Sequence, residues 1–177
     1  AASDVYKRQS YSDNVSFSLA STGSAGTYSR TVYIWFKDQA GNVSSSASDG
    51  ITLVVSDTTV PSSPTININT GDSSTTSTSV TLTLSATDNK GITDYYVSEE
   101  STRPALANSG WKPVLRQSSS YSENVSFTLS SASYAGNHSR TVYVWFKDAA
   151  GNVSDSASDS ISLVIAYFDE SAIIADT

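Results

Sequence analysis

The chain contains no cysteine and no methionine, and only one of its 177 residues is a histidine. Because no disulfide can cross-link the fold, a eukaryotic secreted module is not favoured. Ten basic residues stand against 17 acidic ones, a net charge of −7. We therefore expect no nucleic-acid partner, since a phosphate backbone requires a basic surface. No apolar run approaches the roughly 20 residues that cross a bilayer, so we expect no membrane span.

Serine and threonine, in contrast, make up about a third of the residues. Threonine is common in strands and serine in turns. The apolar residues, 38% of the chain, occur in short runs that alternate with polar residues, as they do in half-buried strands. The composition therefore predicts an all-β protein.

A 45-residue segment occurs twice, at an offset of 110. Residues 11–55 align without a gap to residues 121–165, with 31 identities. A period of 110 residues is the size of one β-sandwich domain. We therefore expect residues 57–166 to form one complete repeat and residues 11–56 to be the C-terminal half of a first repeat.

The two ends of the chain differ from the repeats. We expect residues 1–10 to be a non-native or unmatched segment, and residues 167–177 to be a linker or the beginning of another module. The first residues lack the apolar core of a signal peptide. Any export signal is therefore expected to lie outside this sequence.

Alternating apolar residues predict seven strands in the complete repeat, joined as an antiparallel Greek-key sandwich. The expected strands are residues 65–68, 79–86, 92–97, 111–115, 124–129, 140–148 and 161–165. Their inward side chains are expected to form the core: Val80, Leu82, Leu84, Val97, Val125, Phe127, Val142, Val144, Phe146, Ile161 and Leu163.

The first copy is expected to contain only the last three of these strands. Their apolar face would include Val32, Ile34 and Phe36 and would lack the opposite sheet that covers it. We therefore expect this half repeat to be frayed, or to pair with a second molecule.

Three stretches of the complete repeat resemble a known family: TDNKGITDYYVSEESTRPA (residues 87–105), SGWKPV (109–114) and SRTVYVWFKDAAGNVS (139–154). They are similar to the immunoglobulin-like domains repeated in tandem in large bacterial surface proteins. They also resemble fibronectin type III domains, although Arg140 stands where that family has its corner tyrosine. The resemblance implies an immunoglobulin-like sandwich and an extracellular or cell-surface location on a bacterium.

The function that this resemblance implies is a structural spacer or stalk in an adhesin-like protein. Its partners would be neighbouring repeats of the same chain, with host or matrix glycans or proteins bound through other domains. The resemblance implies no enzymatic activity, and the residues point to none. His138 has no histidine counterpart in the first copy, and Glu99 and Glu100 are adjacent in an extended chain, so their side chains point apart.

The motif Asp148-Ala149-Ala150-Gly151-Asn152 recurs as Asp38-Gln39-Ala40-Gly41-Asn42. The simplest interpretation of this motif is a hairpin turn, in which the Asp side chain caps the turn and Gly adopts a positive φ. In a Greek-key sandwich, however, Asp57, Asp88 and Asp148 would meet at the end of the domain that faces the preceding repeat. Their carboxylates are suitable ligands for calcium, and the resemblance implies calcium at such inter-repeat junctions.

A second candidate site is the aromatic pair Tyr143 and Trp145, expected on the sheet face opposite the core. Such a pair can stack on sugar rings, which would make the domain a carbohydrate-binding module. More often, such a pair packs against neighbouring side chains of the sheet or against cross-strand partners. Glycan binding is therefore the alternative to a spacer function.

Overall fold

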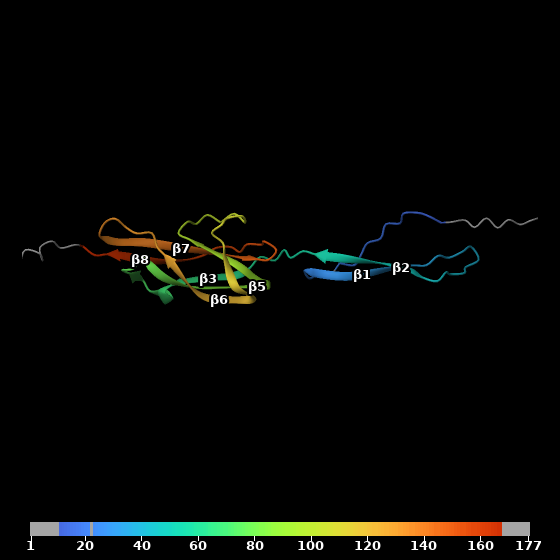
Figure 1. The fold of residues 1–177 in the computed structure, drawn as a ribbon, viewed down its shortest axis with the longest axis horizontal. Coiled ribbons are helices and arrows are strands. Elements are labelled where there is room, and N and C mark those ends of the chain that lie inside the picture. The colour runs from blue at the N-terminus through green and yellow to red at the C-terminus, as the bar shows by residue number, and fades with distance from the viewer. Residues whose placement is uncertain (1–10, 22, 168–177) are drawn as a thin grey trace, which may run out of the picture. The chain divides into compact units, whose positions relative to one another are not determined.

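The computed structural model describes residues 11–21 and 23–167. The chain divides into two compact units, unit 1 (Ala1–Ser56) and unit 2 (Asp57–Thr177). The all-β prediction is confirmed: the described residues form strands and loops, with one short 3-10 turn, η1 (Asn69–Gly71) (Figure 1). Across these residues we find no helix that is long and apolar enough to span a membrane.

Unit 1 contains an antiparallel pair of strands, β1 (Gly26–Ile34) and β2 (Ala47–Val55). The bridge between Lys37 and Val43 closes the turn that follows β1. The strand expected around residues 15–19 is not formed. In unit 2 the equivalent residues pair with the strand that begins at Ser79, and the described part of unit 1 contains no counterpart of that strand.

Unit 2 contains six strands in one sheet, ordered β3-β5-β7-β8-β4, with β6 paired to β5. All neighbours are antiparallel except β4 and β8, which are parallel. The strands are β3 (Ser62–Ile68), β4 (Ser74–Thr75), β5 (Ser79–Ser98), β6 (Lys112–Thr128), β7 (Gly136–Asp148) and β8 (Ala157–Ile165).

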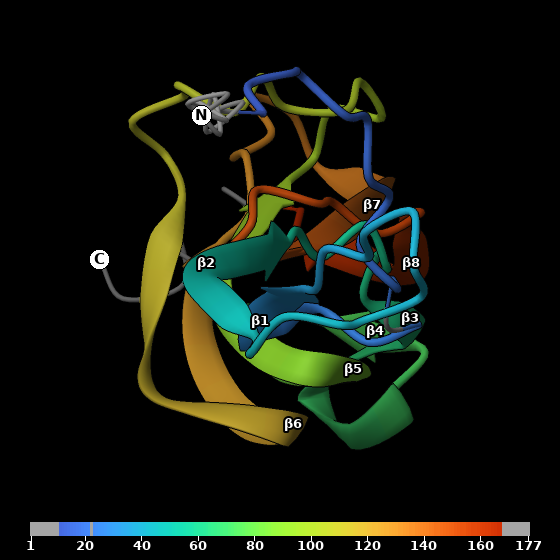
Figure 2. The same ribbon diagram turned by 90° about the vertical axis from the view of Figure 1, so that its right-hand side faces the viewer.

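Two pairs of strands that we expected to be separate are continuous. The first part of β5 pairs with β3 and β6, and its second part pairs with β7 and still with β6, with a break in register between Thr87 and Ile92. At this break Asp88 accepts two backbone hydrogen bonds and Gly91 has a φ of 97°. A bulge of this kind bends a strand without ending it. The strands expected at residues 79–86 and 92–97 are therefore one strand with a bulge, and β6 bends with β5 (Figure 2).

Because β5 bends, the residues on its two halves contribute to one core. Eight of the expected core residues are buried, and Val97, Val125 and Phe127 are partly buried against them, so the core prediction is confirmed. The core also includes residues outside the expected set, namely Ile66, Ile68, Ala86, Ile92, Tyr121 and Leu129.

Candidate metal centre

Three aspartates from separate segments of unit 2 converge at one place. Asp57 lies in the segment before β3, Asp88 in the bulge of β5, and Asp148 at the C-terminal end of β7. One carboxylate oxygen from each lies within 4.8 Å of those of the other two. These are the three residues that the sequence proposed as metal ligands, and the folding of β5 and β7 brings them together.

Asp57 is held by short-range contacts and by the other two segments. Its Oδ1 accepts hydrogen bonds from the backbone N–H of Thr59 at 3.1 Å and from Nδ2 of Asn89 at 3.3 Å. Its backbone carbonyl accepts a hydrogen bond from Nδ2 of Asn152 at 3.2 Å. Its Oδ2 atom is buried and has no hydrogen-bond partner.

Asp88 is only 7% exposed. Its Oδ1 accepts hydrogen bonds from the backbone N–H groups of Lys90 and Gly91, at 2.8 and 2.7 Å. Its Oδ2, like that of Asp57, is buried without a hydrogen-bond partner. A buried carboxylate oxygen that lacks a partner costs free energy, because water no longer solvates it. A bound cation would remove that cost.

Asp148 is 2% exposed, and both of its oxygens are engaged by Asn152. The backbone N–H of Asn152 donates to Oδ1 and its side-chain Nδ2 donates to Oδ2, each at 2.8 Å. Asn152 thus connects Asp148 to the backbone of Asp57. We did not assign Asn152 or Asn89 to the site from sequence. The repeated turn motif could have indicated that Asn152 contacts Asp148. For Asn89, nothing in the sequence indicated a role in the site except its position next to Asp88.

The charge of the cluster suits a hard cation. The backbone N–H of Thr59 contributes most to lowering the pKa of the Asp57 carboxyl below its ordinary value, with help from the Asn89 amide and the charge of Lys90, so the group is ionised at neutral pH. The atoms that could bind a metal are all carboxylate oxygens. Calcium and magnesium prefer oxygen ligands, whereas zinc typically takes nitrogen and sulfur ligands. Calcium lies about 2.3–2.6 Å from its oxygen ligands, so oxygens on one ion are up to about 5 Å apart. The observed separations fit this limit.

The same turn occurs in unit 1 without the other two aspartates. There Asn42 donates through its backbone N–H and its Nδ2 to the carboxylate of Asp38, both at 2.8 Å. Gly41 and Gly151 have φ values of 94° and 88°, as the turn interpretation predicted. The hydrogen bonds between Asp and Asn therefore belong to the turn itself. The cluster in unit 2 differs because Asp57 and Asp88 also lie beside this turn.

The aromatic pair lies on the face opposite the core, but that face is covered. Trp145 is 2% exposed and packs with Trp111 and Val153, while Tyr143 is partly buried beside it. The segment between β5 and β6 supplies the cover: Trp111 donates from its indole N–H to the carbonyl of Ala105 at 3.0 Å. The ring of Trp145 is therefore not presented to a ligand. Alternation alone did not predict this, because it describes one strand and not the loop folded over it.

The residues considered for catalysis have structural contacts. The Glu99 carboxylate accepts a hydrogen bond from the backbone N–H of Ser130 at 2.8 Å and lies 3.7 Å from Nε of Arg140. Arg140 also donates to the carbonyls of Ser130 and Ser131. His138 lies on β7, with its Nε2 at 2.9 Å from the carbonyl of Tyr134. These contacts attach the loop after β6 to neighbouring strands.

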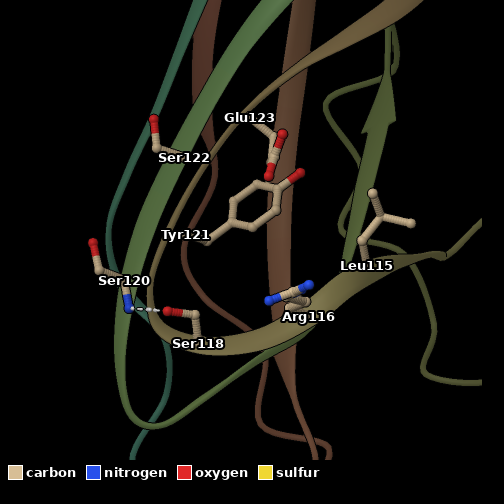
Figure 3. Close-up of a pocket in the computed structure, with 7 residues that line it drawn as sticks. All are labelled: Leu115, Arg116, Ser118, Ser120, Tyr121, Ser122 and Glu123. Atoms are coloured by element: carbon tan, nitrogen blue, oxygen red, sulfur yellow. Dashed lines mark hydrogen bonds between the residues drawn. The ribbon is translucent and has the colours of Figure 1, made fainter.

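A hollow of about 290 Å³ follows the bent edge of β6 (Figure 3). Tyr121 lies on the core side of this hollow and is 6% exposed, stacked on Tyr95 and tilted against Phe146. Burial, with smaller contributions from Tyr95 and Glu123, raises its pKa to about 12. The phenol is thus part of the core. The residues that line the hollow are Leu115, Arg116, Ser118, Ser120, Tyr121, Ser122 and Glu123.

Comparisons of the chain with models of protein families and with curated proteins find no match. The functional argument therefore rests on the geometry of the aspartate cluster and on the internal repeat.

Proposed function

We propose that the chain is a segment of a structural spacer built from immunoglobulin-like Greek-key sandwich repeats, in which calcium attaches the linker before a repeat to that repeat. The bacterial cell surface, where free calcium is plentiful, is the location that this role suits. The observation that carries the proposal is the cluster of Asp57, Asp88 and Asp148, with two buried carboxylate oxygens that lack a hydrogen-bond partner.

The position of the cluster supports a spacer role. Strand β2 ends at Val55, only two residues before Asp57. A cation that binds Asp57 together with Asp88 and Asp148 therefore restrains the chain immediately after the preceding repeat. In a tandem array, restraint of each linker makes the array stiffer without any disulfide, which this cysteine-free chain does not have.

The expected affinity is modest. Three carboxylates are fewer protein ligands than the six to eight oxygens that calcium takes, so water and backbone carbonyls complete the shell. Extracellular modules bind calcium with dissociation constants of about 10⁻⁴–10⁻³ M. At 10 mM calcium such a site stabilises the folded state by about 1.4–2.7 kcal/mol.

The test is thermal and urea unfolding of the full chain with and without 10 mM calcium. Asp88→Asn removes the charge of one of the two residues whose Oδ2 has no partner, and it keeps the shape of the side chain. We expect calcium to stabilise the wild type and to have little effect on this variant. Without calcium, we expect Asp88→Asn to be at least as stable as the wild type, because the variant relieves repulsion among the three carboxylates.

Asp38→Ala is the matched control, because Asp38 occupies the same turn in unit 1 without the two companion aspartates. Its response to calcium should equal that of the wild type, whereas Asp148→Ala should lose the response. Calorimetry of calcium binding should give heat with the wild type and none with Asp148→Ala. Equal heats in both proteins, or no heat in either, would exclude calcium binding at this cluster.

The spacer role has a separate readout in the backbone mobility of the linker. Calcium should raise the amide ¹⁵N heteronuclear NOE at Thr58 and Thr59 in the wild type and leave it unchanged in Asp88→Asn. If calcium binds but the mobility of these residues does not change, the site is real and the stiffening role is wrong. The burial of Trp145 argues against the glycan-binding alternative for the complete repeat in unit 2.

A further inference from the structure

The β1–β2 pair of unit 1 has an unpaired edge and exposed apolar side chains. Strand β1 pairs with β2 along one edge, and among the described residues no strand pairs with its other edge. Ile34 and Phe36 are 44% and 47% exposed, and Trp35, on the opposite face, is 56% exposed. Both faces of the pair are therefore open to solvent in unit 1.

Unit 2 shows what covers the same residues when a repeat is complete. Val144, Trp145 and Phe146, the equivalents of Ile34, Trp35 and Phe36, are 0%, 2% and 0% exposed. The second part of β5 pairs with the edge of β7 that is free in β1, with Val97 opposite Val144 and Tyr95 opposite Phe146. Residues from β3, β5 and β6 complete the core on one face, and Trp111 covers Trp145 on the other.

The β1–β2 pair already has the geometry of its counterpart in unit 2. Gly26 pairs with Val55 and Ile34 with Ala47, at the same register as Gly136 with Ile165 and Val144 with Ala157. The turn is also the same: Ser44 donates from its backbone N–H to the carbonyl of Phe36 at 2.8 Å, and Ser154 to that of Phe146 at 2.9 Å. A partner strand can therefore bind β1 without rearrangement of the pair.

We propose that the free edge and apolar face of β1 bind the N-terminal half of a repeat of this kind, by antiparallel strand addition. The occupant is a segment with the sequence character of residues 57–120. Its strand equivalent to Ile92–Ser98 lies along residues 33–38, and its remaining strands cover Val32, Ile34 and Phe36. The register follows from unit 2 with the offset of 110: the equivalent of Val97 faces Ile34, and that of Tyr96 faces Trp35. Strand addition supplies main-chain hydrogen bonds, and the side chains that alternate along the strand supply specificity.

The experiment supplies this segment in cis. Residues 57–120 are placed directly before Tyr11 of the full chain, in place of residues 1–10, so that Tyr11 takes the position of Tyr121. Hydrogen exchange at the amides of Val32 and Ile34 should slow by at least a thousandfold and approach that of Val142 and Val144. Adding Ile34→Asp to the extended chain should abolish the gain at Val32 while unit 2 keeps its protection.

The absence of cysteine allows a direct test of register. In the extended chain, Cys at Ile34 and at the grafted equivalent of Val97 should form a disulfide, because directly opposed residues lie about 4.5–5.5 Å apart. Cys at Phe36 with the same grafted position is the out-of-register control and should stay reduced. Equal oxidation of the two pairs, or unchanged exchange at Val32, would overturn the proposal. So would protection of Val32 in the unextended chain at concentrations where it dimerises, since the occupant would then be a second β1–β2 pair.

Discussion

The β1–β2 pair of unit 1 and the β7–β8 pair of unit 2 share most of their sequence and their local structure, but not their burial. Both have the same register, the same bridge after the first strand and the same hydrogen bonds in the turn. Phe36 is nevertheless 47% exposed, whereas Phe146 is fully buried. Local sequence is therefore enough to specify the pairing and the turn. Burial depends on strands distant in sequence, which unit 2 has and the described part of unit 1 lacks.

The sharpest test of this comparison is hydrogen exchange in the full chain at low concentration. Amides in the core of a folded domain exchange through global opening, which costs about 5–15 kcal/mol, whereas frayed strands exchange at almost no cost. We expect Val142, Val144 and Phe146 to be protected more than a thousandfold better than Val32, Ile34 and Phe36. Equal protection of the two sets in a monomer would show that unit 1 is stable by itself.

The second test compares Phe146→Ala with Phe36→Ala. Removing a buried phenylalanine costs about 3–5 kcal/mol, enough to unfold a marginal domain. We expect that loss for Phe146→Ala in urea unfolding of unit 2, monitored at amides of β7 and β8. Phe36→Ala should change the same transition by less than about 0.5 kcal/mol. A loss below about 1 kcal/mol for Phe146→Ala would mean that the side chain does not face the core.

The smallest expected effect concerns Tyr121 and its counterpart Tyr11, which is 65% exposed. Burial raises the pKa of Tyr121 to about 12, so the folded state holds the phenolic proton more tightly than the unfolded chain, whose tyrosines have a pKa of about 10. The resulting stability is fully present below pH 10 and is lost as the pH rises through about 12. It amounts to at most about 3 kcal/mol.

Urea unfolding between pH 9 and 12 measures this effect. We expect the stability of unit 2 to fall less steeply with pH in Tyr121→Phe than in the wild type, since phenylalanine has no proton to lose. Tyr11→Phe is the control and should follow the wild type. Identical pH slopes for all three proteins would contradict the assignment of Tyr121 to the core.

Much of the fold and of the site followed from short-range patterns. The alternation of Val142, Val144 and Phe146 with polar or aromatic neighbours indicated which side chains enter the core. The spacing of Asp148 and Asn152 predicted a turn with Gly151 at positive φ. The proximity of Asp57, Asp88 and Asp148 was inferred from the expected topology, and the structure places them together.

What the patterns did not predict depends on contacts across the fold. Two separate strands were expected at residues 79–86 and 92–97, but pairing with β3, β6 and β7 keeps β5 continuous through a bulge. Trp145 was expected on the face opposite the core, either packed against its neighbours or available to a sugar, and the segment that contains Trp111 covers it. Alternation identifies the two faces of a strand, and it carries no information about which distant segment covers each face.

The sequence by itself determined the all-β class, the offset of 110 residues, the turn after the first strand of each pair and many of the core side chains. These features depend on intervals of two to five residues or on direct repetition. Only the tertiary structure decided which copy of the repeated strands is buried and how the two parts of β5 pair with different strands. It also decided that one carboxylate oxygen of Asp57 and one of Asp88 are buried without a hydrogen-bond partner. Burial and desolvation are properties of the surroundings of a residue, and those surroundings are assembled from segments as far apart as Asp57 and Asn152, which one hydrogen bond joins across 95 positions of the chain.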